Sequence, residues 1–145
     1  MGSREPIAKG YIELHGLSRK DAAKYGTSRR FWGALHYALG VPATVLASLA
    51  ATLGGAEIVS VRAAAFLAGG AALFAALVTF LNPNAKWQEA RRLELRNQAI
   101  AERASGALTT RVPDLNVKAS ELSAELASLK QERDALLTPA PALLG

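Results

Sequence analysis

The chain has 145 residues, no cysteine and a formal net charge of +5, and 50% of its residues are hydrophobic. The lack of cysteine excludes a disulfide framework, a thiolate nucleophile and a cysteine-type zinc site. The two histidines, His15 and His36, have no partner at the spacing of a metal site, so we expect no metal and no cofactor.

Residues 1–30 are predicted to form a basic cytoplasmic segment, with seven Lys or Arg against three acidic residues. Its first ten residues contain Gly2, Pro6 and Gly10, which favour a flexible start. The run Ser18-Arg19-Lys20-Asp21 resembles a capping box and predicts a short helix from Ser18 to about Tyr25. Gly26-Thr27-Ser28 is expected to end that helix.

Two long apolar runs follow. From Phe31 to Ala56, 26 residues pass without a charged side chain, and from Ala63 to Leu81 another 19 do the same. About 20 apolar residues cross the roughly 30 Å hydrocarbon core as a helix, because a helix satisfies its own backbone hydrogen bonds in lipid. Only six residues separate the runs, so residues 31–82 predict a two-span transmembrane hairpin. The expected fold class is an all-α membrane protein with cytoplasmic helices and a C-terminal heptad helix.

Both runs carry ridges of small or polar residues at four-residue spacing. The first ridge is His36, Gly40, Thr44, Ser48 and Thr52; the second is Ala64, Ala68, Ala72 and Ala76, with Gly69 and Gly70 beside it. Small residues at this spacing let membrane helices approach closely, so both ridges are candidates for hairpin packing. The first ridge is also a candidate for lining a water-filled pore, because intramembrane polar groups usually face a bundle interior or a cavity. Two helices cannot enclose a channel, so a pore requires a homo-oligomer.

Phe66, Leu73 and Phe80, seven residues apart, are then expected to face lipid or a neighbouring subunit.

Pro42 is expected to kink the first span, because it cannot donate to the Ala38 carbonyl. Gly54-Gly55 is expected to end this span. At Asn82-Pro83 one helix should end and another begin, since Asn is a favoured N-cap and Pro a favoured first helical residue. Pro42, Asn82 and Pro83 are therefore candidate hinges.

Residues 83–111 are predicted to form a basic cytoplasmic helix, with six Lys or Arg against three acidic residues. Basic residues thus gather at both outer ends of the hairpin, which by the positive-inside rule places both termini in the cytoplasm. The same cations are expected to contact anionic membrane lipid; the candidates are Arg29, Arg30, Lys86, Arg91 and Arg92. Membrane topology explains this charge better than nucleic-acid binding does, so no nucleic-acid partner is expected.

Gly106 and Pro113 bracket a further break, after which residues 112–138 show heptads. Leu115, Leu122, Leu129 and Leu136 occupy d positions, and Leu126 occupies an a position. Glu125 and Lys130 are spaced for an ion pair between helices. Two interpretations remain open: a coiled coil that joins subunits, or a single amphipathic helix that packs on the helix at 83–105. Residues 139–145 are expected to be a disordered tail.

The stretch from His36 to Leu46, and Thr79-Phe80-Leu81-Asn82-Pro83 followed by Lys86, resemble the SLATT family, the SMODS and SLOG-associating two-transmembrane effector domains of bacteria. The resemblance covers about residues 15–110. Gly40 and Pro42 match the first-span segment of the family, and Asn82, Pro83 and Lys86 match its junction. The resemblance implies an effector of a bacterial anti-phage conflict system that forms pores in the inner membrane. A sensor or nucleotide synthase is expected as a separate partner chain.

The expected function is therefore an oligomeric, pore-forming effector of the bacterial inner membrane. A membrane-tethered coiled-coil scaffold is one alternative. A phage holin is another, although holins usually have a short charged tail and here 64 residues follow the second run. An enzyme is not expected, because no Ser/His/Asp set, carboxylate pair or glycine-rich phosphate loop is present.

Overall fold

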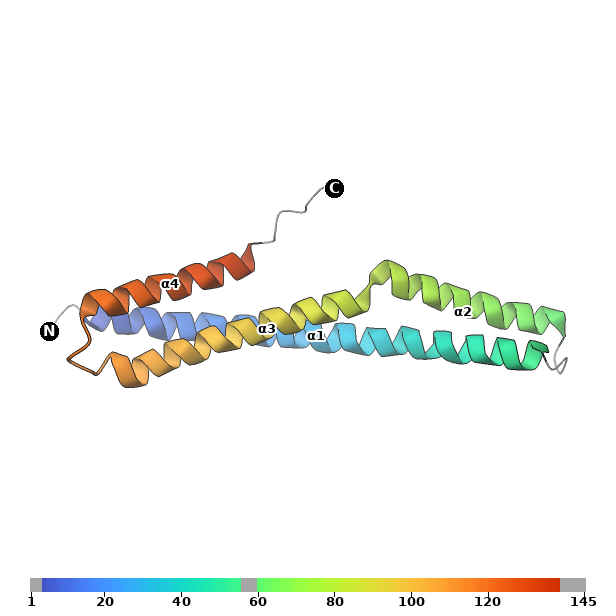
Figure 1. Ribbon diagram of the computed structural model, residues 1–145, viewed down its shortest axis with the longest axis horizontal. Helices are drawn as coiled ribbons and strands as arrows, with labels where there is room; N and C mark the ends of the chain where they lie inside the picture. Colours follow the sequence, from blue (N-terminus) through green and yellow to red (C-terminus); the bar gives the residue numbers. More distant parts are fainter. Residues whose placement is uncertain (1–3, 56–59, 139–145) are drawn as a thin grey trace. The chain divides into compact units, whose positions relative to one another are not determined.

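The computed structural model describes residues 4–55 and 60–138, and every regular element in these ranges is helical. The elements are α1 (Arg4–Gly55), α2 (Val61–Leu81), α3 (Pro83–Gly106), the π-helical turn η1 (Ala107–Arg111) and α4 (Ala119–Leu137) (Figure 1). They form two compact units. Met1–Gly26 with Arg91–Gly145 is here called the polar unit, and Thr27–Ala90 the apolar unit. The predicted all-helical fold is confirmed for the described residues, and the predicted tail at 139–145 lies outside them.

Helix α1 corrects the prediction for the N-terminal segment. It runs without interruption for 52 residues, so the expected short helix at 18–25 and the break at Gly26-Thr27-Ser28 are wrong. Ser18 is not an N-cap but a fully buried residue inside the helix. Tyr11, Leu14, Ser18 and Ala22 form one buried stripe at helical spacing. Burial of this stripe outweighs the cost of Gly26 inside a helix, which is about 1 kcal/mol.

Pro42 does not end α1, since the helix continues beyond it to Gly55. The predicted end at Gly54-Gly55 is confirmed, and the hinge role of Pro42 stays a prediction. Helix α2 begins after Ser60, whose side chain accepts a hydrogen bond from the Ala63 amide at 3.4 Å. This is the capping geometry that satisfies a free amide of the first helical turn.

The junction between α2 and α3 confirms the predicted break at Asn82-Pro83. Asn82 adopts the left-handed conformation, with φ 43° and ψ 54°, and its amide donates to the Val78 carbonyl at 3.0 Å. Its side-chain oxygen accepts from the Ala85 amide at 3.4 Å, so Asn82 closes one helix and caps the next. Pro83 is the first residue of α3, where its missing amide hydrogen costs nothing.

In the polar unit, α1, α3 and α4 share one hydrophobic core. The buried members of this cluster are Tyr11, Leu14, Ile100, Ala104, Ala107 and Leu129. Leu122 is also fully buried. Arg4 fastens the non-helical link between η1 and α4, because its guanidinium donates to the carbonyls of Val112 at 3.0 Å and Asp114 at 2.7 Å. The polar unit is therefore a small helical bundle formed within one chain.

The heptad prediction is corrected in two ways. Residues 112–118 are not helical, and Leu115 is 85% exposed. The first of the predicted heptads is therefore not part of a helix. Leu122 and Leu129 are 0% exposed, and Leu126 and Leu136 pack against the same core. The structure thus shows the second of the two open interpretations, in which this helix packs within its own chain. Leu122 and Leu129 are not available to a second subunit in this state.

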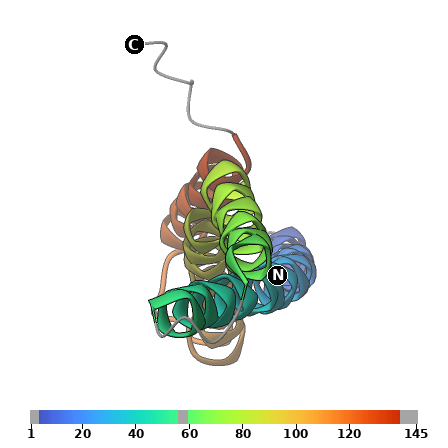
Figure 2. The ribbon, with the colours of Figure 1, turned by 90° about the vertical axis from the view of Figure 1, so that its right-hand side faces the viewer.

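In the apolar unit, α2 lies beside residues 27–55 of α1 and runs in the opposite direction (Figure 1). Figure 2 looks onto the end where α1 stops and α2 starts, and it shows the two helices next to each other. Two helical stretches, Arg4–Gly54 and Val61–Arg111, are long and apolar enough to cross a membrane. Their most apolar windows are 0% and 6% buried, whereas the core helix of a soluble protein is mostly buried.

Candidate functional site

The two apolar helices meet along a seam of half-buried residues. On α1 these residues include Leu39, Ala43, Leu46, Ala50 and Leu53; on α2 they include Ala64, Leu67, Gly70, Phe74 and Val78. A Cβ atom added at Gly70 would lie 3.3 Å from Cδ1 of Leu46, and one added at Gly54 would lie 3.5 Å from Cβ of Ala64. Glycine at these two positions therefore lets the helix backbones approach closely.

The predicted packing ridge on α2 is mostly wrong. Ala64 is half-buried in the seam, but Ala68, Gly69, Ala72 and Ala76 are exposed. A Cβ atom at Gly69 would meet nothing within 4 Å. The seam uses a neighbouring stripe that contains Leu67 and Phe74, because larger side chains bury more apolar area between the helices. The prediction for the outer face agrees with the structure: Phe66, Leu73 and Phe80 are 82%, 62% and 87% exposed.

The ridge on α1 divides into two parts. His36 and Gly40 are half-buried, whereas Thr44, Ser48 and Thr52 are exposed. Each of these three hydroxyls donates to the carbonyl four residues earlier in its own helix, at 2.9, 2.8 and 2.8 Å respectively. The hydroxyls therefore do not join α1 to α2, and their donors are satisfied without water. The name hydroxyl ridge is used below for Thr44, Ser48 and Thr52.

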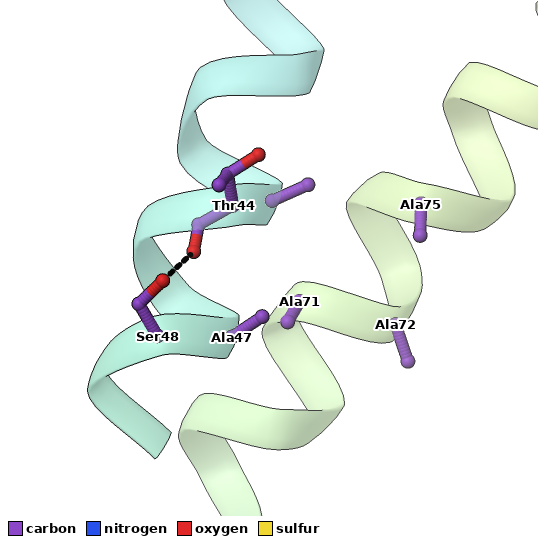
Figure 3. Close-up of a pocket in the computed structure, with 7 residues that line it drawn as sticks. Thr44, Ala47, Ser48, Ala71, Ala72 and Ala75 are labelled. Atoms are coloured by element: carbon purple, nitrogen blue, oxygen red, sulfur yellow. Dashed lines mark hydrogen bonds between the residues drawn. The ribbon is translucent and has the colours of Figure 1, made fainter. Parts of the chain in front are cut away.

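A shallow groove lies next to the hydroxyl ridge, between α1 and α2. It is lined by Ala43, Thr44, Ala47, Ser48, Ala71, Ala72 and Ala75. Figure 3 shows Ala47 and Ala71 pointing toward one another, with Thr44 and Ser48 beside them on α1. The predicted pore-lining residues Thr44 and Ser48 thus border a surface made almost entirely of alanine methyl groups.

His36 lies at the start of the same ridge. Its ring packs edge-on against Tyr37, with 5.6 Å between the ring centroids. Its Nδ1 atom is enclosed and has no hydrogen-bond partner among the described residues. His36, Gly40 and Thr44 also line a second shallow groove. The ridge is therefore continuous along α1, although only its first two members are partly covered.

The cations predicted to contact lipid fall in both units. Lys86, Arg29 and Arg30 belong to the apolar unit, and Arg91 and Arg92 belong to the polar unit. The Nζ atom of Lys86 lies 4.4 Å from the centroid of the Trp32 ring, a cation–π contact between α3 and α1. Trp32 and Lys86 lie in different helices and far apart along the chain, so no local sequence pattern indicates this pairing.

The polar unit holds a network of polar and charged side chains that links α1, η1 and α4. The hydroxyl of Tyr11 donates to the Leu122 carbonyl at 3.0 Å and to Oε2 of Glu125 at 3.3 Å. Arg111 forms an ion pair with the same carboxylate at 2.5 Å. Glu125 was predicted to pair with Lys130 of another helix; its partner in the structure is Arg111 of its own chain. Burial, and then the negative charge of Glu125, raise the pKa of Tyr11 from 10.0 to about 12.

A second ion pair fastens α4 to α1. Nε and a terminal nitrogen of Arg133 donate to Oδ2 of Asp21 at 3.1 and 2.6 Å. Both side chains are largely buried, at 16% and 20% exposure. Asp21 fits a local capping-box pattern and Arg133 follows it by 112 residues, so no local sequence pattern indicates this pair. Among residues 4–55 and 60–138, no three His, Asp or Glu side chains gather where a metal ion would fit.

No family model matches this chain, and comparisons with curated proteins and with solved structures find no match either. The resemblance to the SLATT family therefore stays a prediction.

Proposed function

We propose that the chain is an integral membrane protein whose apolar helices assemble, as copies of the chain, into a pore in the bacterial inner membrane. The first support is the pair of apolar helical windows that are 0% and 6% buried. Exposed apolar surface of this extent is stable in a bilayer and unstable in water. In this arrangement α1 and α2 form the two-span hairpin, and the start of α2 at Ser60 lies outside the cell.

The observation that carries the pore proposal is the position of the hydroxyl ridge. Had the ridge held the hairpin together, Thr44, Ser48 and Thr52 would lie in the seam; instead all three are exposed. Polar side chains on an exposed face of a membrane helix usually face another helix or a water-filled path. Since two helices cannot enclose a path, the ridges of several copies would surround it.

The charge distribution supports the orientation. Residues 1–30 and 83–111 each carry an excess of basic residues, and both adjoin the same end of the apolar helices. By the positive-inside rule the polar unit then lies in the cytoplasm. The resemblance to the SLATT family further supports an effector of an anti-phage conflict system, activated by a separate sensor or nucleotide-producing protein.

Conductance of the reconstituted chain tests the pore. Thr44→Leu with Ser48→Leu is expected to abolish conductance across a planar bilayer while leaving membrane insertion intact, because an apolar constriction excludes water. Thr79→Leu is the matched control. Thr79 is also exposed and also donates to its own helix, at 3.0 Å to the Ala75 carbonyl, but it belongs to α2 and is not part of the hydroxyl ridge. Unchanged conductance in the double variant, or equal loss in the control, would exclude a pore-lining ridge.

A membrane-tethered scaffold is the second candidate, favoured by one observation. The polar unit is a bundle with its own core and several ion pairs, which is a suitable module for recruiting a partner. Replacing residues 31–81 by an unrelated leucine-rich hairpin separates the candidates. A scaffold keeps its cellular activity after this exchange, and a pore loses it.

A further inference from the structure

At one end of the apolar unit, aromatic and cationic side chains from two helices form a cluster. Lys86 of α3 holds its Nζ atom 4.4 Å from the centroid of the Trp32 ring of α1. Phe31 packs edge-on against Trp32, with 5.3 Å between the ring centroids. The ring of Trp32 therefore fixes the ammonium group of Lys86 beside the first residues of an apolar span.

The second tryptophan lies at the same place. A Cβ atom added at Gly33 would be 3.3 Å from Cδ1 and 3.4 Å from Nε1 of Trp87, so the indole of Trp87 lies against the α1 backbone. The chain has two tryptophans in all, and both belong to this cluster. Trp is enriched at the level of lipid headgroups, because its ring is apolar and its N–H is polar.

Along the chain, both basic residues and exposed apolar residues adjoin the cluster. Arg29 and Arg30 directly precede Phe31, and Glu89 is the only acidic residue within 27–36 and 82–90. Phe31 and Phe80, which adjoin the cluster along the chain, are 60% and 87% exposed. A ligand that fits this arrangement has a negatively charged group next to long apolar chains.

We propose that Lys86, Trp32, Trp87 and Arg30 form a binding site for the phosphate of an anionic phospholipid. This proposal rests on the membrane placement above, but not on pore formation. Lys86 and Arg30 bind the phosphate, the two indoles lie at headgroup depth, and the exposed phenylalanines contact the acyl chains. The free phosphate ion fits less well, since it leaves the exposed Phe31 and Phe80 uncovered. The site is more specific than a general attraction of basic residues to the leaflet surface.

Tryptophan fluorescence tests the site directly. The full chain is reconstituted into phosphatidylcholine vesicles that contain increasing fractions of phosphatidylglycerol, with bromine on the acyl chains of one lipid or the other. Bromine quenches indole emission on contact, so quenching measures which lipid is enriched around Trp32 and Trp87. We expect half-maximal quenching at a lower mole fraction of brominated phosphatidylglycerol than of brominated phosphatidylcholine. Lys86→Gln should weaken the preference about fivefold, the contribution of one basic residue at an anionic surface.

Lys24→Gln is the matched control. It removes one exposed positive charge from α1, on the same side of the proposed membrane as the two tryptophans but outside the cluster, and it should keep the preference. Equal loss in the two variants would show a general charge effect and overturn the site, as would equal quenching by both lipids. Displacement by added inorganic phosphate would show an anion site without lipid and also overturn it.

The conductance and quenching experiments distinguish a failure of the pore proposal from a failure of the lipid-site proposal. A lipid preference in a chain without conductance supports the site and contradicts the pore. Absence of quenching by either brominated lipid shows that the tryptophans do not lie in a membrane, and overturns the site together with the membrane placement.

Discussion

At the scale of single residues, the polar unit depends on side chains that are far apart in the sequence. Tyr11, Glu125 and Arg111 come from three different helical elements and meet at one carboxylate oxygen. Asp21 and Arg133 join α1 to α4 in the same way. Such pairs were not predictable, because Asp21 also fits a local capping pattern and its partner Arg133 lies 112 residues further along the chain.

Tyr11 makes the polar unit sensitive to alkaline pH. Its pKa in the folded state is raised from 10.0 to about 12, so folding favours the neutral phenol. This contribution to stability is complete below pH 10 and is lost as the pH rises toward 12. Tyr11→Phe should remove this dependence, and at neutral pH it should cost about 1 kcal/mol through the lost hydrogen bonds.

Tyrosinate absorbance measures this shift. The difference between the titrations of the wild type and Tyr11→Phe isolates one of the three tyrosines of the chain. Its midpoint is expected at about 12. A midpoint near 10 would mean that Tyr11 is not buried against Glu125 in the folded chain.

At the scale of helices, the ends of the apolar segments could be predicted and their faces could not. Gly54-Gly55 and Asn82-Pro83 mark helix ends by backbone chemistry that acts locally. No local backbone signal identifies the face of α2 that packs against α1. Residues 63–81 are apolar all round, so several stripes of small residues compete and the choice depends on the partner helix. The sequence thus identified the hydroxyl ridge but not that it would lie outside the seam.

In the N-terminal part of α1, by contrast, local sequence signals led to a wrong prediction. Ser18 and Gly26 are good local signals for helix ends, and these signals predicted a break that the structure lacks. Tertiary burial of Tyr11, Leu14 and Ala22 overrides them, because packing contributes more than capping or propensity. The α4 leucines follow the same rule. Their spacing predicted an apolar face, but whether the face meets its own chain or a second copy depends on contacts distant in sequence.

Leu129→Ala tests the packing of α4. Leu129 is fully buried in the core of the polar unit, so the substitution should lower the free energy of local opening by about 2–5 kcal/mol. Hydrogen exchange on the reconstituted chain should show faster exchange in α4 and in residues 4–26. Leu115→Ala is the control, since Leu115 is 85% exposed, and it should change exchange little. If Leu129→Ala instead reduced cross-linking between copies and left exchange in α4 unchanged, the leucine would belong to an intermolecular coiled coil.

At the scale of the whole molecule, the chain divides into two units of opposite chemistry. The apolar unit leaves Phe66, Leu73 and Phe80 largely exposed, while the polar unit has a buried hydrophobic core and several ion pairs. A single solvent does not suit both. In the proposed placement, lipid surrounds the apolar unit and water surrounds the polar unit, which suits the chemistry of each.

Labelling of introduced cysteines tests this claim most directly, because the natural chain has none. Single substitutions at Lys9, Ser60 and Lys130 place one thiol each in exposed positions of α1, the start of α2 and α4. In intact spheroplasts, a maleimide that cannot cross the membrane should label only Ser60→Cys, and Lys9→Cys and Lys130→Cys should react after lysis. Labelling of Lys9→Cys or Lys130→Cys from outside, or recovery of all three variants as soluble folded protein without detergent, would contradict a two-span chain with both ends in the cytoplasm.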